Sequence, residues 1–190
     1  KRDLNGYILN EEGVGLALEN KETHLGSILP KMNMGWNLGF GYKGINLGMT
    51  FTGRFGGIVL SETQSVLNAA GVSKISADVR DAGGVPINQA KIDVRNYFQT
   101  IQTASVYYTY SATNVRLGEL SLSYTLPKKW FANKLGMTVG LVGKNLWMIY
   151  CKAPFDPELT TSAASNFYQG FDAYMLPSTR NFGFNVKFQF

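Results

Sequence analysis

Cysteine and histidine are almost absent from this chain of 190 residues, which holds one of each, Cys151 and His24. A single cysteine excludes a disulfide within the chain, and a lone histidine argues against a zinc site. A Ser-His-Asp hydrolase would have to use His24, which lies in the polar stretch 22–24, typical of a solvated loop. Asp156 and Glu158 flank a proline and are better suited to shaping a turn than to acid–base catalysis. We therefore predict that the chain is not an enzyme.

Charge and long apolar runs are also scarce. Charged residues make up 16% of the chain, and no stretch reaches the roughly 18 apolar residues of a membrane-spanning helix. The net charge is +5, but the lysines and arginines are scattered and form no basic stripe, so we do not expect nucleic-acid binding. Glycine and aromatic residues are plentiful instead, with 21 Gly, 12 Phe, 10 Tyr and 3 Trp.

Residues 32–42 alternate with a period of two. The even positions are Met32, Met34, Trp36, Leu38, Phe40 and Tyr42, and the odd positions are Asn33, Gly35, Asn37, Gly39 and Gly41. This pattern predicts a strand with one apolar face and one polar or small face. Lys43-Gly44 then provides a two-residue turn, and alternation resumes over 45–56. The segment therefore predicts a long hairpin.

Three further strands are predicted, over 115–126, 136–150 and 179–190, the second of them less regular than the others. The segments 57–112 and 152–178 lack alternation and are predicted to be long loops. Within the first loop, Ser61 is placed to cap a helix over 62–70, and a shorter helical segment is predicted over 74–81.

The lengths of the strands and the asymmetry of their connections favour a membrane barrel over a soluble sandwich. Strands of about 9–11 residues suit a tilted crossing of a bilayer, whereas soluble strands average about five or six. The short connections, 43–44 and 127–135, fall on one side of the sheet, and the long loops fall on the other, as in outer-membrane barrels. Aromatic residues gather at the strand ends, as they do at membrane interfaces. We predict an all-β, antiparallel transmembrane β-barrel with long extracellular loops.

The predicted strands are too few to form a barrel alone, because the smallest common barrels have about eight. We therefore expect residues 1–190 to be the C-terminal segment of one larger barrel domain. Arg54, Lys144 and Lys187 are predicted to face the lumen. Arg116 shares the even register of Leu120, so the alternation places it on the apolar face near the outer interface, where a charge costs little.

Five motifs occur in a fixed order along the chain: Pro30-Lys31, residues 111–127 (SATNVRLGELSLSYTLP), 143–146 (GKNL), 155–158 (FDPE) and 176–180 (LPSTR). In this order they closely resemble the SusC/RagA family of TonB-dependent transporters from Bacteroidetes. The resemblance implies a barrel of about 22 strands in the outer membrane, which crosses the lipid many times. It also implies a plug domain upstream of this chain, which contacts TonB, and TonB-dependent import of oligosaccharides or peptides. A SusD-like surface lipoprotein would cover the external loops.

A passive porin or a surface-binding barrel without a plug remains the alternative. An upstream plug domain would distinguish the transporter from either of these.

Aromatic residues of the two loops are the candidate substrate contacts, although packing within a folded loop fits them equally well. They are Tyr107, Tyr108, Tyr110, Phe167, Tyr168 and Phe171. The last strand also fits the signal that the barrel assembly machinery reads, which by resemblance comprises Asn181, Gly183, Val186, Phe188 and the terminal Phe190. No cofactor is expected. Asp3 and Asn5 begin a stretch with too few oxygen ligands for a calcium loop of the family's kind.

Overall fold

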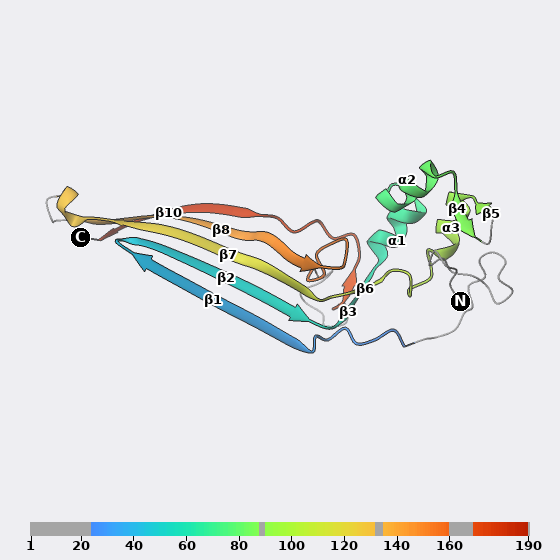
Figure 1. Cartoon of the computed structure of the whole chain (residues 1–190), viewed down its shortest axis with the longest axis horizontal. Helices are drawn as coiled ribbons and strands as arrows, with labels where there is room; N and C mark the ends of the chain where they lie inside the picture. The colour runs from blue at the N-terminus through green and yellow to red at the C-terminus, as the bar shows by residue number, and fades with distance from the viewer. Residues whose placement is uncertain (1–23, 88–89, 132–134, 160–168, 190) are drawn as a thin grey trace. The chain divides into compact units, whose positions relative to one another are not determined.

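A computed structural model describes residues 24–87, 90–131, 135–159 and 169–189, and these fall into two compact units (Figure 1). The sheet unit comprises Ile28–Gly57, Ser111–Leu159 and Leu176–Phe190. The loop unit comprises Lys1–Ser27, Ile58–Tyr110 and Thr160–Met175. Most of the predicted loop 57–112 thus lies in a compact unit of its own, whereas residues 152–159 of the second predicted loop belong to the sheet unit.

The sheet unit is a five-stranded antiparallel sheet with the strand order β1-β2-β7-β8-β10. Its strands are β1 (Met32–Tyr42), β2 (Ile45–Phe55), β7 (Asn114–Leu126), β8 (Gly136–Cys151) and β10 (Asn181–Gln189). The prediction of an antiparallel all-β sheet is confirmed. The alternation along each strand made this possible, because it marks strands independently of their partners.

Strand pairing divides the side chains of this sheet into two faces. Residues directly opposite each other in an antiparallel pair share a face, so Phe40 joins Leu47, and Phe184 joins Leu141. The apolar face comprises Met32, Met34, Trp36, Leu38, Phe40, Tyr42, Ile45, Leu47, Met49, Phe51, Phe55, Val115, Leu117, Leu120, Leu122, Tyr124, Leu126, Met137, Val139, Leu141, Trp147, Tyr150, Phe182, Phe184, Val186 and Phe188. The opposite, polar face carries asparagines, serines, threonines, glycines and a few charges.

A β-bulge in β7 changes the predicted position of Arg116. Thr50 pairs with Glu119, but the next residue of β2, Phe51, pairs with Leu117, so Gly118 has no partner on β2. One extra residue reverses the alternation beyond it. Arg116 therefore lies opposite Thr52 on the polar face, and the prediction that it shares the apolar face is wrong.

Two short connections close one end of the sheet, which we call the hairpin end. Lys43 and Gly44 have φ angles of 46° and 85°, the left-handed pair that a tight two-residue hairpin turn requires. A side chain at residue 44 would also meet the carbonyl oxygen of Thr125 at 2.8 Å, which explains the glycine. The short helix η1 (Lys128–Phe131) lies in the connection between β7 and β8 at the same end. We call the other end of the sheet the open end.

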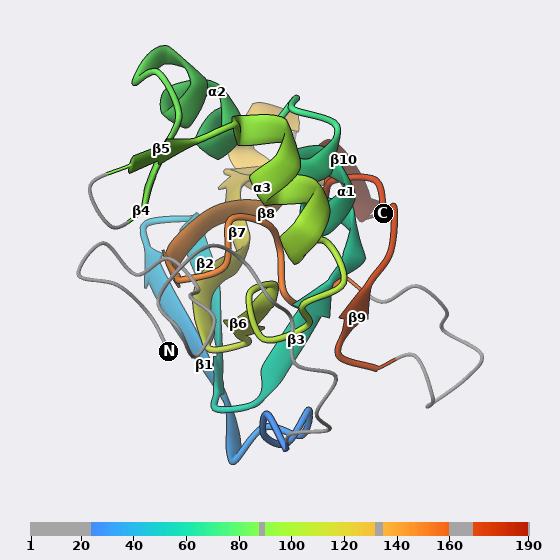
Figure 2. The ribbon, with the colours of Figure 1, turned by 90° about the vertical axis from the view of Figure 1, so that its right-hand side faces the viewer.

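The loop unit contains three helices: α1 (Glu62–Ala69), α2 (Lys74–Asp81) and α3 (Val94–Ile101). The predicted capping of α1 is confirmed, since the Ser61 hydroxyl accepts a hydrogen bond of 3.1 Å from the Gln64 backbone N–H. Helix α2 matches the predicted segment 74–81. Helix α3 was not predicted. Figure 2 shows the three helices gathered beside the hairpin of β4 (Val85–Ile87) and β5 (Ala90–Ile92).

Apolar side chains of this unit form a true core. Its buried members are Val85, Ile87, Tyr97, Phe98, Ile101 and Tyr108. Strands distant in sequence complete the unit, because β3 (Ile58–Ser61) pairs in parallel with β9 (Phe171–Asp172) and also lies beside β6 (Thr109–Ser111). The unit thus folds like a small soluble domain, with aromatic rings inside. Within the described part of the chain, no helix has the length and apolar character needed to cross a membrane.

Candidate functional site

The polar face of the sheet unit is lined by short hydrogen-bonding side chains. The Thr50 hydroxyl donates to the Asn37 side-chain oxygen at 2.9 Å, and the Thr125 and Thr138 hydroxyls lie 3.2 Å apart. Lys144 and Glu119 form an exposed ion pair of 3.7 Å across β7 and β8. These groups are polar and exposed, so the face is suited to contact with water or a polar partner.

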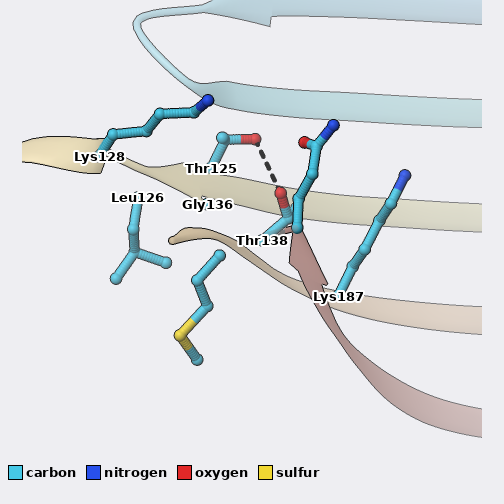
Figure 3. Close-up of a pocket in the computed structure, with 8 residues that line it drawn as sticks. Thr125, Leu126, Lys128, Gly136, Thr138 and Lys187 are labelled. Carbon is cyan, nitrogen blue, oxygen red and sulfur yellow. Dashed lines mark hydrogen bonds between the residues drawn. The ribbon is translucent and has the colours of Figure 1, made fainter. Parts of the chain in front are cut away.

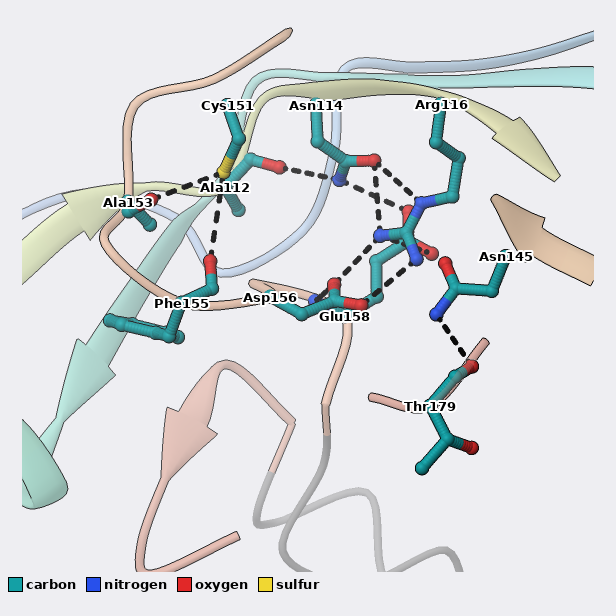
Figure 4. Close-up of polar contacts among 10 residues, drawn as sticks. All are labelled: Ala112, Asn114, Arg116, Asn145, Cys151, Ala153, Phe155, Asp156, Glu158 and Thr179. Carbon is teal, nitrogen blue, oxygen red and sulfur yellow. Dashed lines mark hydrogen bonds and ion pairs between the residues drawn. The ribbon is translucent and has the colours of Figure 1, made fainter. Parts of the chain in front are cut away.

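A cluster of charges lies at the open end of this face. The Arg116 guanidinium donates to both oxygens of Asp156, through Nη1 at 3.0 Å and Nη2 at 2.7 Å, and its Nη2 lies 3.2 Å from a Glu158 oxygen (Figure 4). Arg116 and Asp156 are 11% and 8% exposed, so solvent screens their attraction little. Two parallel charge-assisted hydrogen bonds of this kind are among the stronger polar contacts in proteins.

Asn114 holds the side chains of this cluster in place through hydrogen bonds. Its side chain is fully buried, and its oxygen accepts from Nε and Nη2 of Arg116, each at 3.2 Å. Its amide nitrogen donates to the Ala112 carbonyl at 3.2 Å and to Glu158 at 3.1 Å. The bulge explained above turns Arg116 to this side of the sheet. The Arg116 cluster, comprising Asn114, Arg116, Asp156 and Glu158, thus connects the segment after β8 to the first residues of β7.

The electrostatics of Asp156 follow from this arrangement. Burial alone would raise the pKa of its carboxyl, but hydrogen bonds from Arg116 and from the Glu158 backbone N–H outweigh it and hold the pKa below its ordinary value. The turn predicted for Asp156 and Glu158 is confirmed, because the Glu158 N–H donates to Asp156 Oδ1 at 3.1 Å. Sequence patterns did not indicate that Arg116 is their partner.

A cavity of about 430 Å³ opens beside the Arg116 cluster. Asn33, Thr52, Arg54 and Glu158 contribute polar groups to its lining, and Met34 and Gly53 complete it. We call it the open-end cavity. The Arg54 guanidinium donates from Nη2 to the Ile28 carbonyl at 3.0 Å, while its buried Nε has no hydrogen-bond partner.

A second, smaller cavity of about 90 Å³ lies at the hairpin end. Figure 3 shows Lys128 and Lys187 extending on the same side of the sheet as Thr125 and Thr138, with Leu126 on the other side. Lys187 lies on the polar face, the face that is predicted from the sequence to line the lumen. The view thus shows the polar and apolar faces of the sheet at its hairpin end.

The aromatic residues proposed as substrate contacts differ in their surroundings. Tyr108 is 1% exposed and belongs to the loop-unit core, so its ring has no free surface for stacking and its expected role does not fit the structure. Burial raises the pKa of its hydroxyl to about 12. Tyr107 packs at the edge of that core, and Tyr110 and Phe171 are half-buried in β6 and β9. Phe167 and Tyr168 lie outside the described residues.

The residues of the expected assembly signal lie along β10. Asn181 and Gly183 are on its polar face, and Val186 and Phe188 are on its apolar face. Phe190 lies outside the described residues, as do Asp3 and Asn5 of the stretch considered for calcium. In the parts of the chain that are described, no group of three metal-ligating side chains comes together.

Known proteins resemble both the sequence and the fold. A curated protein of Formosa agariphila, named TonB-dependent receptor P3, is 31% identical over 173 residues, covering 86% of this chain and 17% of its own length. The solved structure of the RagAB peptide importer in its closed-closed state matches 99% of this chain with a TM-score of 0.65 and 22% identity, covering 20% of the matched chain. The open-open state gives a TM-score of 0.61 over 85% of this chain and 17% of the matched one, again at 22% identity. No family model matches the sequence. The chain therefore spans about a fifth of the length of these proteins.

Proposed function

We propose that this chain, which belongs to the TonB-dependent receptors and shares its fold with part of the RagAB importer, is a SusC/RagA-type barrel segment. It supplies wall and external loops to a TonB-dependent importer of the bacterial outer membrane. The observation that carries the proposal is the division of the sheet into a continuous apolar face and a polar face. Such a sheet needs lipid on one side and a hydrated interior on the other.

The exposure of the apolar face supports contact with lipid. Phe182 and Phe184 are 78% and 79% exposed, and Leu141 is 60% exposed. Scattered apolar residues are normal on a soluble surface, but a contiguous patch over five strands marks contact with another apolar phase. The outer strands β1 and β10 end the sheet, and lipid cannot satisfy their free backbone groups. Further strands of the parent protein would pair with them to close the barrel, so that the chain crosses the membrane several times.

The imported substrate is an oligosaccharide or a peptide. One of the matched proteins is named as a peptide importer, which supports a peptide as the substrate. The polar face and its cavities would border the transport path. The loop unit would contribute Tyr107, Tyr110 and Phe171 at the outer surface, together with Phe167 and Tyr168.

Four partners follow from this function. A plug domain upstream of this chain would pass the force from TonB, and a SusD-like surface lipoprotein would meet the external loops. The barrel assembly machinery would recognise β10 through Asn181, Gly183, Val186, Phe188 and Phe190. Outer-membrane lipid would cover the apolar face. The relatives are named as a receptor and an importer, which is consistent with transport in place of catalysis.

Uptake in strains that lack TonB tests the proposal. Cells that express the parent protein should take up labelled peptides or oligosaccharides, and deletion of either tonB or the parent gene should abolish that uptake. A passive porin would keep its uptake in the tonB deletion, and this result would refute energy-coupled import while leaving the barrel intact.

A further inference from the structure

The open-end cavity contains an arginine without an anionic partner. In the described ranges no ion pair includes Arg54, although its guanidinium lies at the cavity wall. One hydrogen-bond donor of this group reaches the Ile28 carbonyl, and the buried Nε donor reaches no acceptor. Native proteins rarely leave a buried donor unsatisfied, and such a group calls for an explanation. Because Nε itself has almost no accessible surface, a ligand in the cavity would meet the terminal nitrogens of the guanidinium, and the charge of Arg54 would attract it.

Glu158 supplies a negative charge to the same cavity. Its carboxylate accepts from Asn114 at 3.1 Å and lies 3.2 Å from Arg116 Nη2, yet its side chain remains 37% exposed. Arg116 is shared with Asp156, so these three residues together carry one net negative charge. Arg54 supplies one positive charge to the same cavity without pairing with Glu158. The cavity thus has separate cationic and anionic groups in its lining.

The size and lining of the cavity limit the ligands that fit it. Its volume of about 430 Å³ lies in the range of small-molecule sites, roughly 300–1,000 Å³. A guanidinium binds a carboxylate in preference to neutral acceptors, because the planar donors match its two oxygens. The lining includes no aromatic ring, so an uncharged sugar would find no stacking surface there.

We propose that the open-end cavity binds the carboxylate of an imported substrate, with Arg54 as its cation and Glu158 accepting from an N–H or O–H donor beside that carboxylate. This inference rests on the proposed import function, and it assigns a chemical class to the substrate. Two sources provide this chemistry: the C-terminal carboxylate of a peptide and the uronic acid of an acidic oligosaccharide. Asn33 and Thr52 add neutral hydrogen-bonding groups for the rest of the ligand.

Calorimetric titration of the purified full-length parent protein in detergent tests the proposal. The probes are Ala-Ala-Ala, its C-terminal amide, trigalacturonic acid and the methyl ester of that acid. We expect at least one of the acids to bind tenfold or more tightly than its uncharged counterpart. Arg54→Gln should remove most of this preference, and Arg54→Lys should keep part of it, because the charge remains while the planar fork is lost.

A matched control is Lys144→Gln, which removes a cation from the same face of the sheet but from outside this cavity, and it should leave the preference unchanged. If only the peptide acid shows the Arg54-dependent preference, the source is a peptide. If only trigalacturonic acid shows it, the source is an acidic sugar. Equal binding of acid and uncharged probes, absence of binding by all four, or an undiminished preference in Arg54→Gln would overturn the proposal.

Folding and energy coupling are controlled separately. If Arg54→Gln fails to fold, the test still has two readouts. These are the difference in affinity between acid and uncharged probes in the wild type, and the affinities of Arg54→Lys. Uptake that persists without TonB, alongside an intact Arg54-dependent preference, would refute the import mechanism alone. TonB-dependent uptake without any carboxylate preference would refute the cavity assignment alone.

Discussion

The two units of this chain place the same kinds of residue in opposite environments. In the loop unit, Phe98 is 1% exposed within a packed core. In the sheet unit, Phe184 is 79% exposed, and among the described residues the largest fully buried apolar side chains all belong to the loop unit. The loop unit is stabilised by withdrawing apolar surface from water. The sheet unit instead keeps its apolar surface outside, so its stability depends on a lipid environment.

The difference also shows in the polar groups. The loop unit caps its helices with serine and aspartate, as soluble proteins do. The sheet unit gathers its polar side chains on one face and secures its open end with the Arg116 cluster. Substitutions that affect one unit and spare the other would test this division.

The largest effect is expected for Phe98→Ala in the loop-unit core. Removal of a buried phenyl ring costs about 3–5 kcal/mol, because the transfer energy is lost and a cavity remains. Hydrogen exchange should then show faster opening of α3, while the sheet unit retains its protection. Val106→Ala, at a position that is 51% exposed, serves as the control and should change little. Equal exchange in the two variants would contradict the assignment of a core.

A comparable but smaller effect is expected for Phe184→Arg on the apolar face of β10. Arginine in the middle of a lipid-facing strand costs about 2–4 kcal/mol. The fraction of parent protein that migrates as a folded barrel in unheated gels should fall. Asn185→Arg places the same charge one residue further on, on the polar face, and should fold normally. A reversed order of the two variants would show that the faces are assigned the wrong way round.

Disruption of the Arg116 cluster should have the next largest effect on stability. Arg116→Met leaves the Asp156 carboxylate buried without its partner, at a cost of about 1.5–3 kcal/mol. Limited proteolysis should then cleave the segment 152–159 faster. Lys144→Met removes the exposed pair with Glu119 and should cost about 0–1 kcal/mol. Similar cleavage rates in the two variants would contradict a stabilising role for the cluster.

Acid should loosen the same segment reversibly. The pKa of Asp156 is lowered in the folded state, so its contribution is complete above the unfolded value of about 3.9 and is lost as pH falls through the folded value. Proteolysis by pepsin should therefore accelerate below about pH 4 in the wild type. Asp156→Asn cannot titrate and should show no such step at this site. A change in the cleavage rate near neutral pH would instead indicate that a different titrating group controls the segment.

The smallest effect is expected at the helix caps of the loop unit. Ser73→Ala removes the acceptor for the Ser76 N–H and should cost about 1 kcal/mol. Ser61→Ala should cost more, because the Ser61 hydroxyl also donates to the buried Asp172 at 2.5 Å. Thermal protection of α1 and α2, measured by hydrogen exchange, would rank the two variants. A greater loss for Ser73→Ala would refute the added role of Asp172.

Sequence reasoning located the strands and their faces because alternation is a local signal. Met32–Tyr42 and Asn181–Gln189 alternate without interruption, and both are strands. The bulge at Gly118 had a readable signal that was missed, because the apolar positions shift from Val115 and Leu117 to Leu120 and Leu122 across a glycine inside the strand. The placement of Arg116 failed for that reason.

Three other features were missed, for two different reasons. Helix α3 had a readable signal, because Asp93 caps it and Val94, Tyr97, Phe98 and Ile101 follow helical spacing. The pairing of Ser61 with Asp172 joins positions far apart in the chain, and no local pattern marks such a contact. The Arg116 cluster is of the same kind, since its carboxylates lie about 40 residues away from the arginine.

Spin-label accessibility along β10 tests the central claim most directly. Single cysteines at positions 181–189, in a Cys151→Ser background of the full-length parent protein in liposomes, would carry the label. We predict that collisions with oxygen are frequent at even positions and that collisions with a water-soluble nickel chelate are frequent at odd positions. Equal access of the chelate to both sets would contradict a sheet with one face in lipid.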